Sequence, residues 1–238
     1  EKILLAGMQV TADNHLDGFE GRLEILRNLG DALEQITKGQ GIRPSDLVLD
    51  LVQHNSLDLT QVLEALLRVL APIWPLGTKI SGQHYGDVGE HSLLDTTDIA
   101  TGKVPIHKLS QWLTYSLIEP LQQAGIYVFG MENLTGLGEY RNGGLLIDIG
   151  VLELKDPKFS TAVAEPASEL IVEWRALTIA ILDELVPQVA RKLELTDEKF
   201  SLLMLLQGGS WSAGRLLAYQ RNKNGEPPIK LKNTGAVF

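Results

Sequence analysis

The sequence predicts a mostly α-helical fold in one domain over residues 1–238, with room for two lobes. Apolar residues recur at helical spacing in several long segments. Hydrophobic side chains make up 44% of 238 residues, which is enough for a well-buried core. No convincing linker interrupts the chain, so we expect one folded unit.

The first strong helical pattern covers residues 23–33, where five Leu and Ile residues fall on one broad face. We expect Thr60 to cap the next helix, because threonine at this position bonds the free N–H groups of a first turn. Pro72 and Pro75 should end or bend that helix.

The segment from Pro105 to Gly125 predicts another amphipathic helix, kinked or split at Pro120. Before it, residues 76–104 read as a long polar loop, which in a compact domain is usually functional. After it, residues 126–129 (IYVF) suit a short strand with no obvious partner.

The C-terminal third predicts helices in turn. Residues 168–193 form the most apolar helical segment, which we expect to be central, buried and bent near Pro187. A further helix should end at Gly208-Gly209, and a last one covers residues 211–222. The tail after Gly225 reads as extended.

Composition limits the function. A net charge of −9 argues against broad binding to nucleic acid or to an anionic membrane, yet leaves room for a small anionic ligand. The chain has no cysteine, which removes thiolate catalysis and disulfides and fits a reducing compartment. No apolar run approaches the roughly 20 residues that span a bilayer.

The chain opens EKILLAG without Met, so we expect further residues to precede it. We also expect a cytoplasmic protein.

One glycine-rich stretch, LTGLGEYRNGGLLIDIG at 134–150, carries Glu139, Tyr140 and Arg141. Its Gly-x-Gly does not continue with the spacing of a dinucleotide-binding loop. We interpret it as a catalytic or sugar-binding turn, in which glycines let the backbone approach a ligand closely.

A second candidate lies near the start of the helix after Pro105. Lys108, Gln111 and Tyr115 share one helical face, and His107 and Trp112 lie beside it. A lysine near a helix N-terminus is a plausible phosphate site.

Charges also interrupt the most apolar helix at Glu173, Trp174 and Arg175. Such charges need partners or a cavity. Two interpretations stay open: a salt bridge with Arg141 or Asp148, or the wall of a polar pocket.

Two polar loop segments are weaker candidates for a functional site. GQHYGDVGEH at 82–91 holds His84, Asp87, Glu90 and His91, which suit either a divalent metal or a hydrogen-bonded loop. DTTDIATGK at 95–103 weakly resembles the diphosphate loop of phosphoribosyltransferases, although only two leucines stand where a strand should precede it.

Long blocks of the chain resemble an uncharacterised family linked to uracil catabolism, some members of which are labelled uracil phosphoribosyltransferase-like. The blocks are VPIHKLSQWLTYSLIEPLQQAGI, LTGLGEYRNGGLLIDIGVLELKDP, SELIVEWRALTIAILDEL and the tail PPIKLKNTGAVF. More distantly, the same blocks resemble the queuosine-salvage nucleotide N-glycosidases. That resemblance implies a helical fold similar to helix-hairpin-helix DNA glycosylases.

The second resemblance also implies site residues. It places Glu139 where that family has its catalytic Asp, one methylene longer here. It matches Gln111, Glu173 and Arg175 by residue, and Lys108 approximately. We therefore expect a hydrolase that needs no cofactor or metal and cleaves the N-glycosidic bond of a pyrimidine-derived nucleotide, either ring-opened or UMP. A carboxylate at Glu139 would stabilise the cationic sugar. The expected substrate-binding residues are Lys108, Gln111, Trp112, Tyr140, Arg141, Asp148, Glu173, Trp174 and Arg175.

Within that set, Lys108 with Arg141 or Arg175 would hold the phosphate, and Trp112, Trp174 or Tyr140 would stack on the leaving group. Two alternatives stay open: a phosphoribosyltransferase, and a noncatalytic protein that binds a nucleotide or a pathway enzyme.

Overall fold

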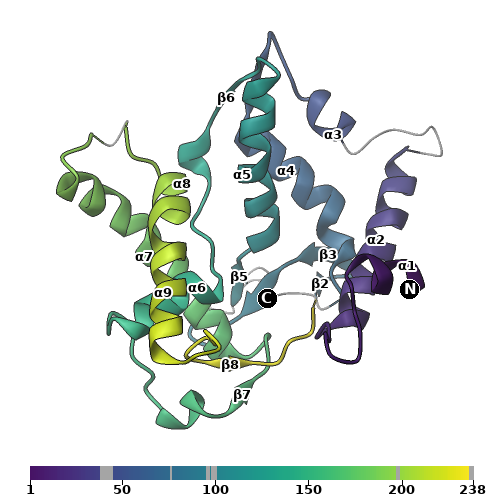
Figure 1. Ribbon diagram of the computed structural model, residues 1–238. Helices are drawn as coiled ribbons and strands as arrows, with labels where there is room; N and C mark the ends of the chain where they lie inside the picture. Colours follow the sequence, from purple (N-terminus) through teal and green to yellow (C-terminus); the bar gives the residue numbers. More distant parts are fainter. Residues whose placement is uncertain (38–44, 76, 95–96, 98–100, 197–198, 236–238) are drawn as a thin grey trace.

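The computed structural model describes residues 1–37, 45–75, 77–94, 97, 101–196 and 199–235, and its fold is mostly α-helical, as predicted (Figure 1). The α-helices are α1 Lys2–Gly7, α2 Phe19–Thr37, α3 Asp46–Leu49, α4 Leu59–Leu70, α5 Lys108–Gln123, α6 Tyr140–Asp148, α7 Glu169–Lys192, α8 Leu202–Leu205 and α9 Trp211–Arg221. The strands are β1 Ser56–Asp58, β2 Thr78–Ile80, β3 Gln83–Gly86, β4 Val88–Glu90, β5 Lys103–Pro105, β6 Tyr127–Phe129, β7 Val163–Ala164 and β8 Lys230–Leu231. Short 3-10 turns cover Ala71–Ile73, Met131–Asn133 and Pro157–Ser160, and a π-helical turn covers Leu206–Ser210.

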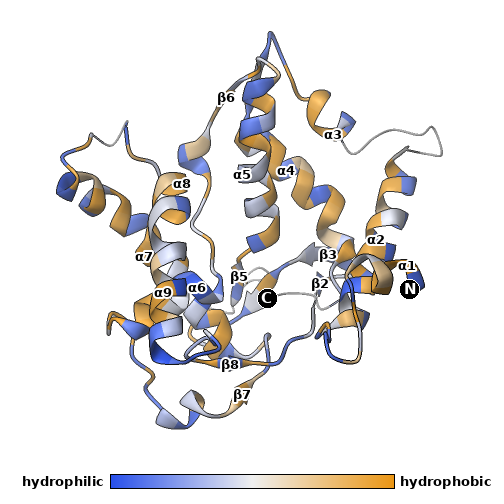
Figure 2. Cartoon of the chain, viewed as in Figure 1, coloured by the Kyte–Doolittle hydropathy of each residue, from blue (hydrophilic) through white to orange (hydrophobic). Residues whose placement is uncertain are grey.

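The helices α2, α4 and α5 surround one part of the core. Orange and blue residues alternate along them in Figure 2, as expected of amphipathic helices. The expected cap at Thr60 is wrong by two residues: Asp58 is the N-cap of α4, and its carboxylate accepts a hydrogen bond from Thr60 N at 2.9 Å. Aspartate caps a helix at least as well as threonine, and it comes first along the chain. The helix ends at Leu70, before Pro72, as predicted.

Helix α5 begins later than predicted. Lys103–Pro105 pairs with β4 as strand β5, so the helix starts only at Lys108. It ends as predicted, because Gly125 adopts φ +79° beyond its last turn. Pro120 does not split it, since a proline near a helix end removes only one backbone hydrogen bond.

The expected long loop at 76–104 is wrong for the residues that the structure describes there. β2 pairs antiparallel with β3, and β4 pairs antiparallel with β5. These strands have only three or four residues, and β3 and β4 contain glycine, so the alternation of polar and apolar residues was too short to recognise. The predicted strand at 126–129 exists as β6, and its parallel partner is β1.

The C-terminal helices match the prediction in part. α7 is one helix from Glu169 to Lys192, close to the expected bounds, with Pro187 inside it. The pair Gly208-Gly209 does not end a helix: α8 passes through the π-helical turn into α9. Within the described part of the chain, no helix is both long and apolar enough to cross a bilayer.

Glycines bring α6 close to its neighbours. A Cβ on Gly143 would lie 2.6 Å from Trp174 Nε1 and 2.7 Å from Thr178 Oγ1, and one on Gly138 would lie 2.9 Å from Arg175 O. Gly214 of α9 meets the backbone of Arg141 in the same way. Several glycines of the predicted turn therefore serve helix packing, and this packing fixes the N-terminal end of α6 against α7.

Candidate functional site

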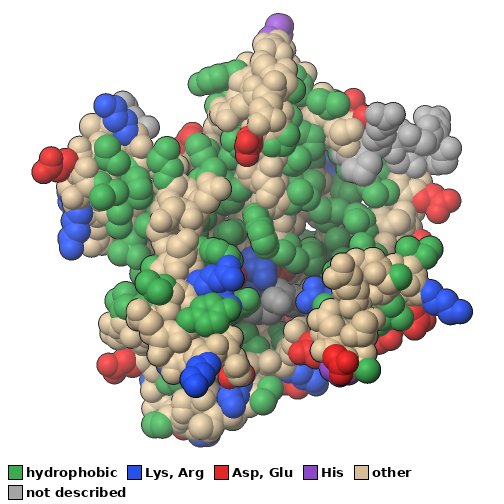
Figure 3. Space-filling model, in the orientation of Figure 1, with side chains coloured by type: hydrophobic (Ala, Val, Ile, Leu, Met, Phe, Trp, Pro, Cys, Tyr) green, Lys and Arg blue, Asp and Glu red, His purple; other side chains and the backbone are tan. Residues whose placement is uncertain are grey.

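Polar and charged side chains from four elements converge near the N-terminal ends of α5 and α6. The other contributors are the first turns of α7 and Asp87, which separates β3 from β4. Figure 3 shows Lys and Arg side chains gathered in a hollow in the centre of one face, over the region where Figure 1 places α6 and the start of α5.

A buried ion pair joins α7 to the strands. Arg175, 3% exposed, donates from both Nη atoms to the two carboxylate oxygens of Asp87, at 2.8 and 2.7 Å. Its Nε donates to the carbonyl oxygen of Gly138 at 3.1 Å. All three guanidinium nitrogens are therefore used within the protein, and Arg175 is a poor candidate to clamp a phosphate.

Asp87 also positions the start of α5. Its Oδ2 accepts a hydrogen bond from Lys108 N at 3.1 Å, and its backbone oxygen accepts from Ile106 N and His107 N. His107 makes no side-chain capping bond, so Asp87, which lies between β3 and β4 and is 21 residues earlier than Lys108, caps the helix instead. His107 itself takes a left-handed backbone conformation, φ 47°, which is uncommon outside glycine.

Lys108 is a lysine in an unusual environment, only 7% exposed. Burial lowers the pKa of its ammonium to about 8, and the nearby positive charge of Arg175 acts in the same direction. The negative charges of Asp87 and Glu139 oppose this shift in its pKa. The amine thus changes charge close to neutral pH, which an exposed lysine does not.

Glu139 is the N-cap residue of α6. Its two carboxylate oxygens accept hydrogen bonds from Arg141 N at 2.8 Å and from Asn142 N at 2.5 Å. Burial raises the pKa of Glu139, while these bonds and the charges of Lys108 and Arg141 act to lower it. Each oxygen retains a lone pair that a water or a ligand can use, since a carboxylate offers about four acceptor positions.

The segment before Glu139 is held by α5. Gln111 Oε1 accepts from Thr135 N at 3.4 Å, and the Tyr115 hydroxyl donates to the carbonyl oxygen of Thr135 at 3.1 Å. Gln111, Tyr115 and Lys108 are all buried on the same face of α5. The predicted polar stripe therefore exists, and it supports the loop that carries Glu139.

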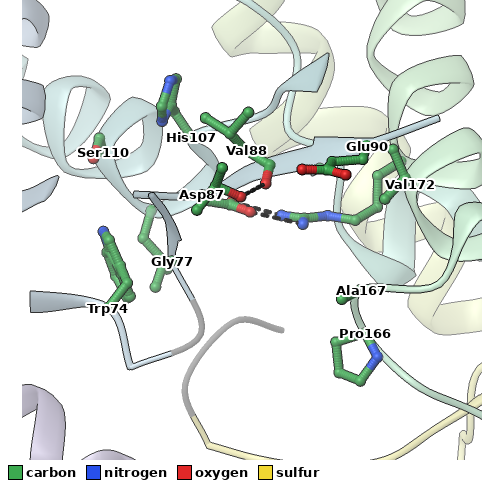
Figure 4. Close-up of a pocket in the computed structure, with 14 residues that line it drawn as sticks. Trp74, Gly77, Asp87, Val88, Glu90, His107, Ser110, Pro166, Ala167 and Val172 are labelled. Carbon is green, nitrogen blue, oxygen red and sulfur yellow. Dashed lines mark hydrogen bonds and ion pairs between the residues drawn. The ribbon is translucent and has the colours of Figure 1, made fainter. Parts of the chain in front are cut away.

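A cavity of about 280 Å³ lies beside this cluster (Figure 4). Trp74 stands on one side and Pro166 and Ala167 on the other, with Asp87 between them. Glu139 and Lys108 do not line it. The guanidinium of Arg175 connects the two places, because it faces Asp87 in the cavity and binds the residue before Glu139.

The structure brings together part of the predicted site. Lys108 and Glu139 influence each other's charge, and Arg141 acts on Glu139 from the first turn of α6. The Arg141 guanidinium lies 4.8 Å from the ring centroid of Tyr140 and donates to the carbonyl oxygen of Gly225 at 2.6 Å. These residues form a contiguous charged group.

Other predicted residues lie elsewhere. Trp112 is 56% exposed, on the solvent side of α5. Asp148 ends α6 and pairs with Arg221 at 2.9 Å. Nine residues of helix separate it from the cap, or about 13 Å at the usual rise per residue. Trp174 is buried against Gly143 and contributes to packing.

The salt bridges anticipated for α7 are also wrong. Arg175 pairs with Asp87, and Glu173 lies 3.7 Å from His91, so neither uses Arg141 or Asp148. Sequence patterns identify charges that need partners, but not which distant segment supplies them.

The glycine-rich segment at 82–91 gives little support for the metal alternative. Among the residues that the structure describes, no group of three or more His, Asp or Glu side chains is placed to hold an ion. Glu90 pairs with Lys103, His91 with Glu173, and Asp87 with its arginine. Much of the DTTDIATGK segment lies outside the described residues, and the strands that flank it, β4 and β5, are antiparallel.

Sequence reasoning missed three residues. Asp87 was considered as a metal ligand or as part of a hydrogen-bonded loop, not as the partner of Arg175, while Trp74 and Ser110 were not singled out, although both line the cavity. No local signal could identify them, because Trp74 follows a proline-rich helix end and Ser110 is one polar residue in an amphipathic pattern.

Almost the whole chain is similar in sequence to known proteins. A family model described as "Protein of unknown function (DUF1688)" matches residues 1–238. "Protein urg3" of Schizosaccharomyces pombe is 43% identical over 241 residues, covering 98% of this chain and 57% of the relative. "Uracil catabolism protein 4" of Lachancea kluyveri is 40% identical over 268 residues, covering 98% of this chain and 60% of the relative. No solved structure matches significantly. The chain thus spans somewhat more than half the length of these relatives.

Proposed function

The chain belongs to the DUF1688 family, and on that premise we propose that it acts in uracil catabolism as a nucleotide N-glycosidase. The substrate is a pyrimidine-derived ribonucleoside 5′-phosphate, either a ring-opened uracil nucleotide or UMP. The helical fold agrees with the resemblance to queuosine-salvage N-glycosidases, and similarity to helix-hairpin-helix DNA glycosylases is part of the same proposal.

One observation carries the proposal: a partly buried carboxylate, Glu139, fixed by two backbone N–H groups beside a buried lysine. When an N-glycosidic bond breaks, its electron pair leaves with the nitrogen and C1′ becomes cationic. A fixed carboxylate stabilises that charge and accepts a proton from the water that adds to C1′, while the leaving nitrogen takes up a proton. Products are ribose 5-phosphate and the free base or urea.

The charges near Glu139 fit an anionic substrate. Lys108 and Arg141 both lower the pKa of Glu139 by their positive charge, and in this proposal the two cations hold the phosphate of the same nucleotide. Arg175 is excluded from that role by its two bonds to Asp87. Of the two expected phosphate-binding pairs, the proposal therefore keeps Lys108 with Arg141 and drops Lys108 with Arg175.

The test is release of ribose 5-phosphate from ribosylurea 5′-phosphate, UMP and a nucleotide panel. Glu139→Gln should lower kcat about 10²- to 10³-fold with substrate affinity retained, because the neutral amide keeps the size but loses the charge. Glu139→Asp, which restores the residue of the queuosine-salvage family, should retain more activity than Glu139→Gln. Glu132→Gln, an exposed carboxylate in the same segment, is the matched control and should match the unsubstituted protein.

Two results would replace the proposal. Binding without turnover of any substrate would favour a noncatalytic nucleotide-binding protein. Formation of UMP from uracil and phosphoribosyl diphosphate would favour the transferase, for which the described strands provide no parallel sheet beside residues 95–103.

A further inference from the structure

We propose that the cavity beside Trp74 binds the leaving group of this reaction, an uncharged planar ureido group. Both a pyrimidine ring and an open-chain urea present this chemistry. The inference rests on the proposed function, and it assigns the cavity a role separate from that of Glu139.

The cavity, called the slot below, has an aromatic side chain on one side and apolar residues on the other. Trp74 is held on one side by two glycines: Gly77 N donates to the carbonyl oxygen of Trp74 at 3.0 Å, and Gly86 packs against the indole. A Cβ on Gly86, which has φ +71°, would lie 3.1 Å from Trp74 Cδ1. The other wall is apolar, from Pro166, Ala167 and Val172 (Figure 4). An aromatic face opposite a smooth apolar wall suits a planar ligand.

Polar groups at the edge of the slot have hydrogen-bonding capacity for a ligand. Ser110 is 3% exposed as a residue and lines the cavity, where its hydroxyl can donate to or accept from a ligand. His107 also lines the cavity, and burial lowers the pKa of its imidazole, which favours the neutral form. A ureido group offers matching N–H donors and a carbonyl acceptor.

The charges in the lining favour an uncharged ligand over a phosphate. Arg175 is matched by Asp87, and Glu90 is matched by Lys103. A phosphate would have to compete with the Asp87 carboxylate for the same buried guanidinium, which disfavours an anionic ligand there.

The position of the cavity also fits. Arg175 binds Asp87 in the cavity and the carbonyl oxygen of Gly138, the residue before Glu139. One guanidinium therefore links the slot to the segment that carries Glu139, and the proposal places the leaving group in the slot and the sugar carbon beside Glu139.

Tryptophan fluorescence tests the inference without turnover. Free uracil and N-methylurea, titrated up to their solubility limits, distinguish the ring from the open urea, and ribose 5-phosphate serves as the second ligand. At least one of the two ureido probes should quench the fluorescence. Trp74→Phe should abolish the quench, whereas Trp211→Phe, which changes an indole 43% exposed on α9, should keep it. Ser110→Ala should weaken ureido binding about fivefold to tenfold, and Ser116→Ala, an exposed hydroxyl on the same helix, should not.

The two proposals fail separately. Two results would overturn the cavity assignment but leave the proposed glycosidase activity supported by the release of ribose 5-phosphate. In the first, neither ureido probe binds. In the second, binding is unaffected by substitution of Trp74 and of Ser110. If uracil or N-methylurea binds through Trp74 and no nucleotide is cleaved, the site stands and the glycosidase falls. Should Ser110→Ala fail to fold, the fluorescence of the two tryptophan variants decides alone.

Discussion

Replacing Asp87 by Ala tests the central ion pair of the site. In the folded protein this substitution leaves the guanidinium of Arg175, 3% exposed, without its two carboxylate bonds. It also removes the acceptor for Lys108 N at the start of α5. The carbonyl oxygen of Gly138 would still accept a hydrogen bond from Arg175 Nε.

The expected loss follows from these contacts. Breaking one side of a buried ion pair costs about 3–5 kcal/mol, and loss of a helix cap adds about 1 kcal/mol. Since domains are stable by roughly 5–15 kcal/mol, Asp87→Ala should bring the protein close to unfolding. Combining it with Arg175→Met removes the stranded charge, so the double variant should be more stable than the sum of the two single losses predicts, by about 2 kcal/mol or more.

Urea unfolding followed by circular dichroism measures these differences, with the m-value checked for each variant. Glu64→Ala is the control: it breaks the Glu64–Arg68 pair, which is 2.6 Å long but has side chains 68% and 75% exposed. That loss should stay below about 1 kcal/mol. An Asp87→Ala protein within about 1 kcal/mol of the original, at an unchanged m-value, would show that the pair is not buried as described.

The remaining predictions concern Lys108 and the packing of α6. Because the pKa of Lys108 in the folded protein is about 8, kcat/KM should fall as pH rises through 8. The variant Lys108→Arg should show this fall at higher pH. A fall at the same pH in both proteins would contradict a role for this amine. Below pH 8 the buried lysine is charged and destabilises the fold, whereas in the unfolded chain it keeps its proton up to about pH 10.4. The free energy of unfolding should therefore rise between pH 8 and about pH 10.4, measured relative to Lys108→Met. The rise should reach up to roughly 3 kcal/mol. A flat difference in thermal or urea stability across that window would show that the amine is not desolvated. Gly143→Ala should lower stability by about 1–3 kcal/mol through contact with Trp174 and Thr178, whereas Gly208→Ala, with nothing within 4 Å, should be nearly neutral; equal effects in urea unfolding would refute the close packing.

Local patterns predicted a substantial part of the fold. The helices at 19–37, 108–123 and 169–192 follow from periodicity within single segments. Boundaries were less accurate where two signals competed, as at α5, where strand pairing of Lys103–Pro105 overrode the helix-starting tendency of proline. Strands of three or four residues were largely missed, because so few residues carry almost no alternation.

The candidate site divides in the same way. Glu139 and Lys108 were identifiable because each is an ionisable residue at the start of a segment with a clear pattern. Asp87 was not identifiable as the partner of Arg175, since 88 residues separate them and nothing in either segment specifies the other. The two indoles expected to stack show the same limit: Trp112 lies exposed on α5 and Trp174 is buried against Gly143, and a sequence does not reveal the direction in which an indole points.

By itself the sequence determined which segments are helical and which side chains carry charge, since both depend on residues within a few positions of each other. Only the tertiary structure decided which charges meet. It set Asp87 against Arg175, buried Lys108 near Glu139, and opened a cavity beside Trp74. The physical reason is that pairing and burial depend on contacts between distant segments, and those contacts follow from how all the helices pack together.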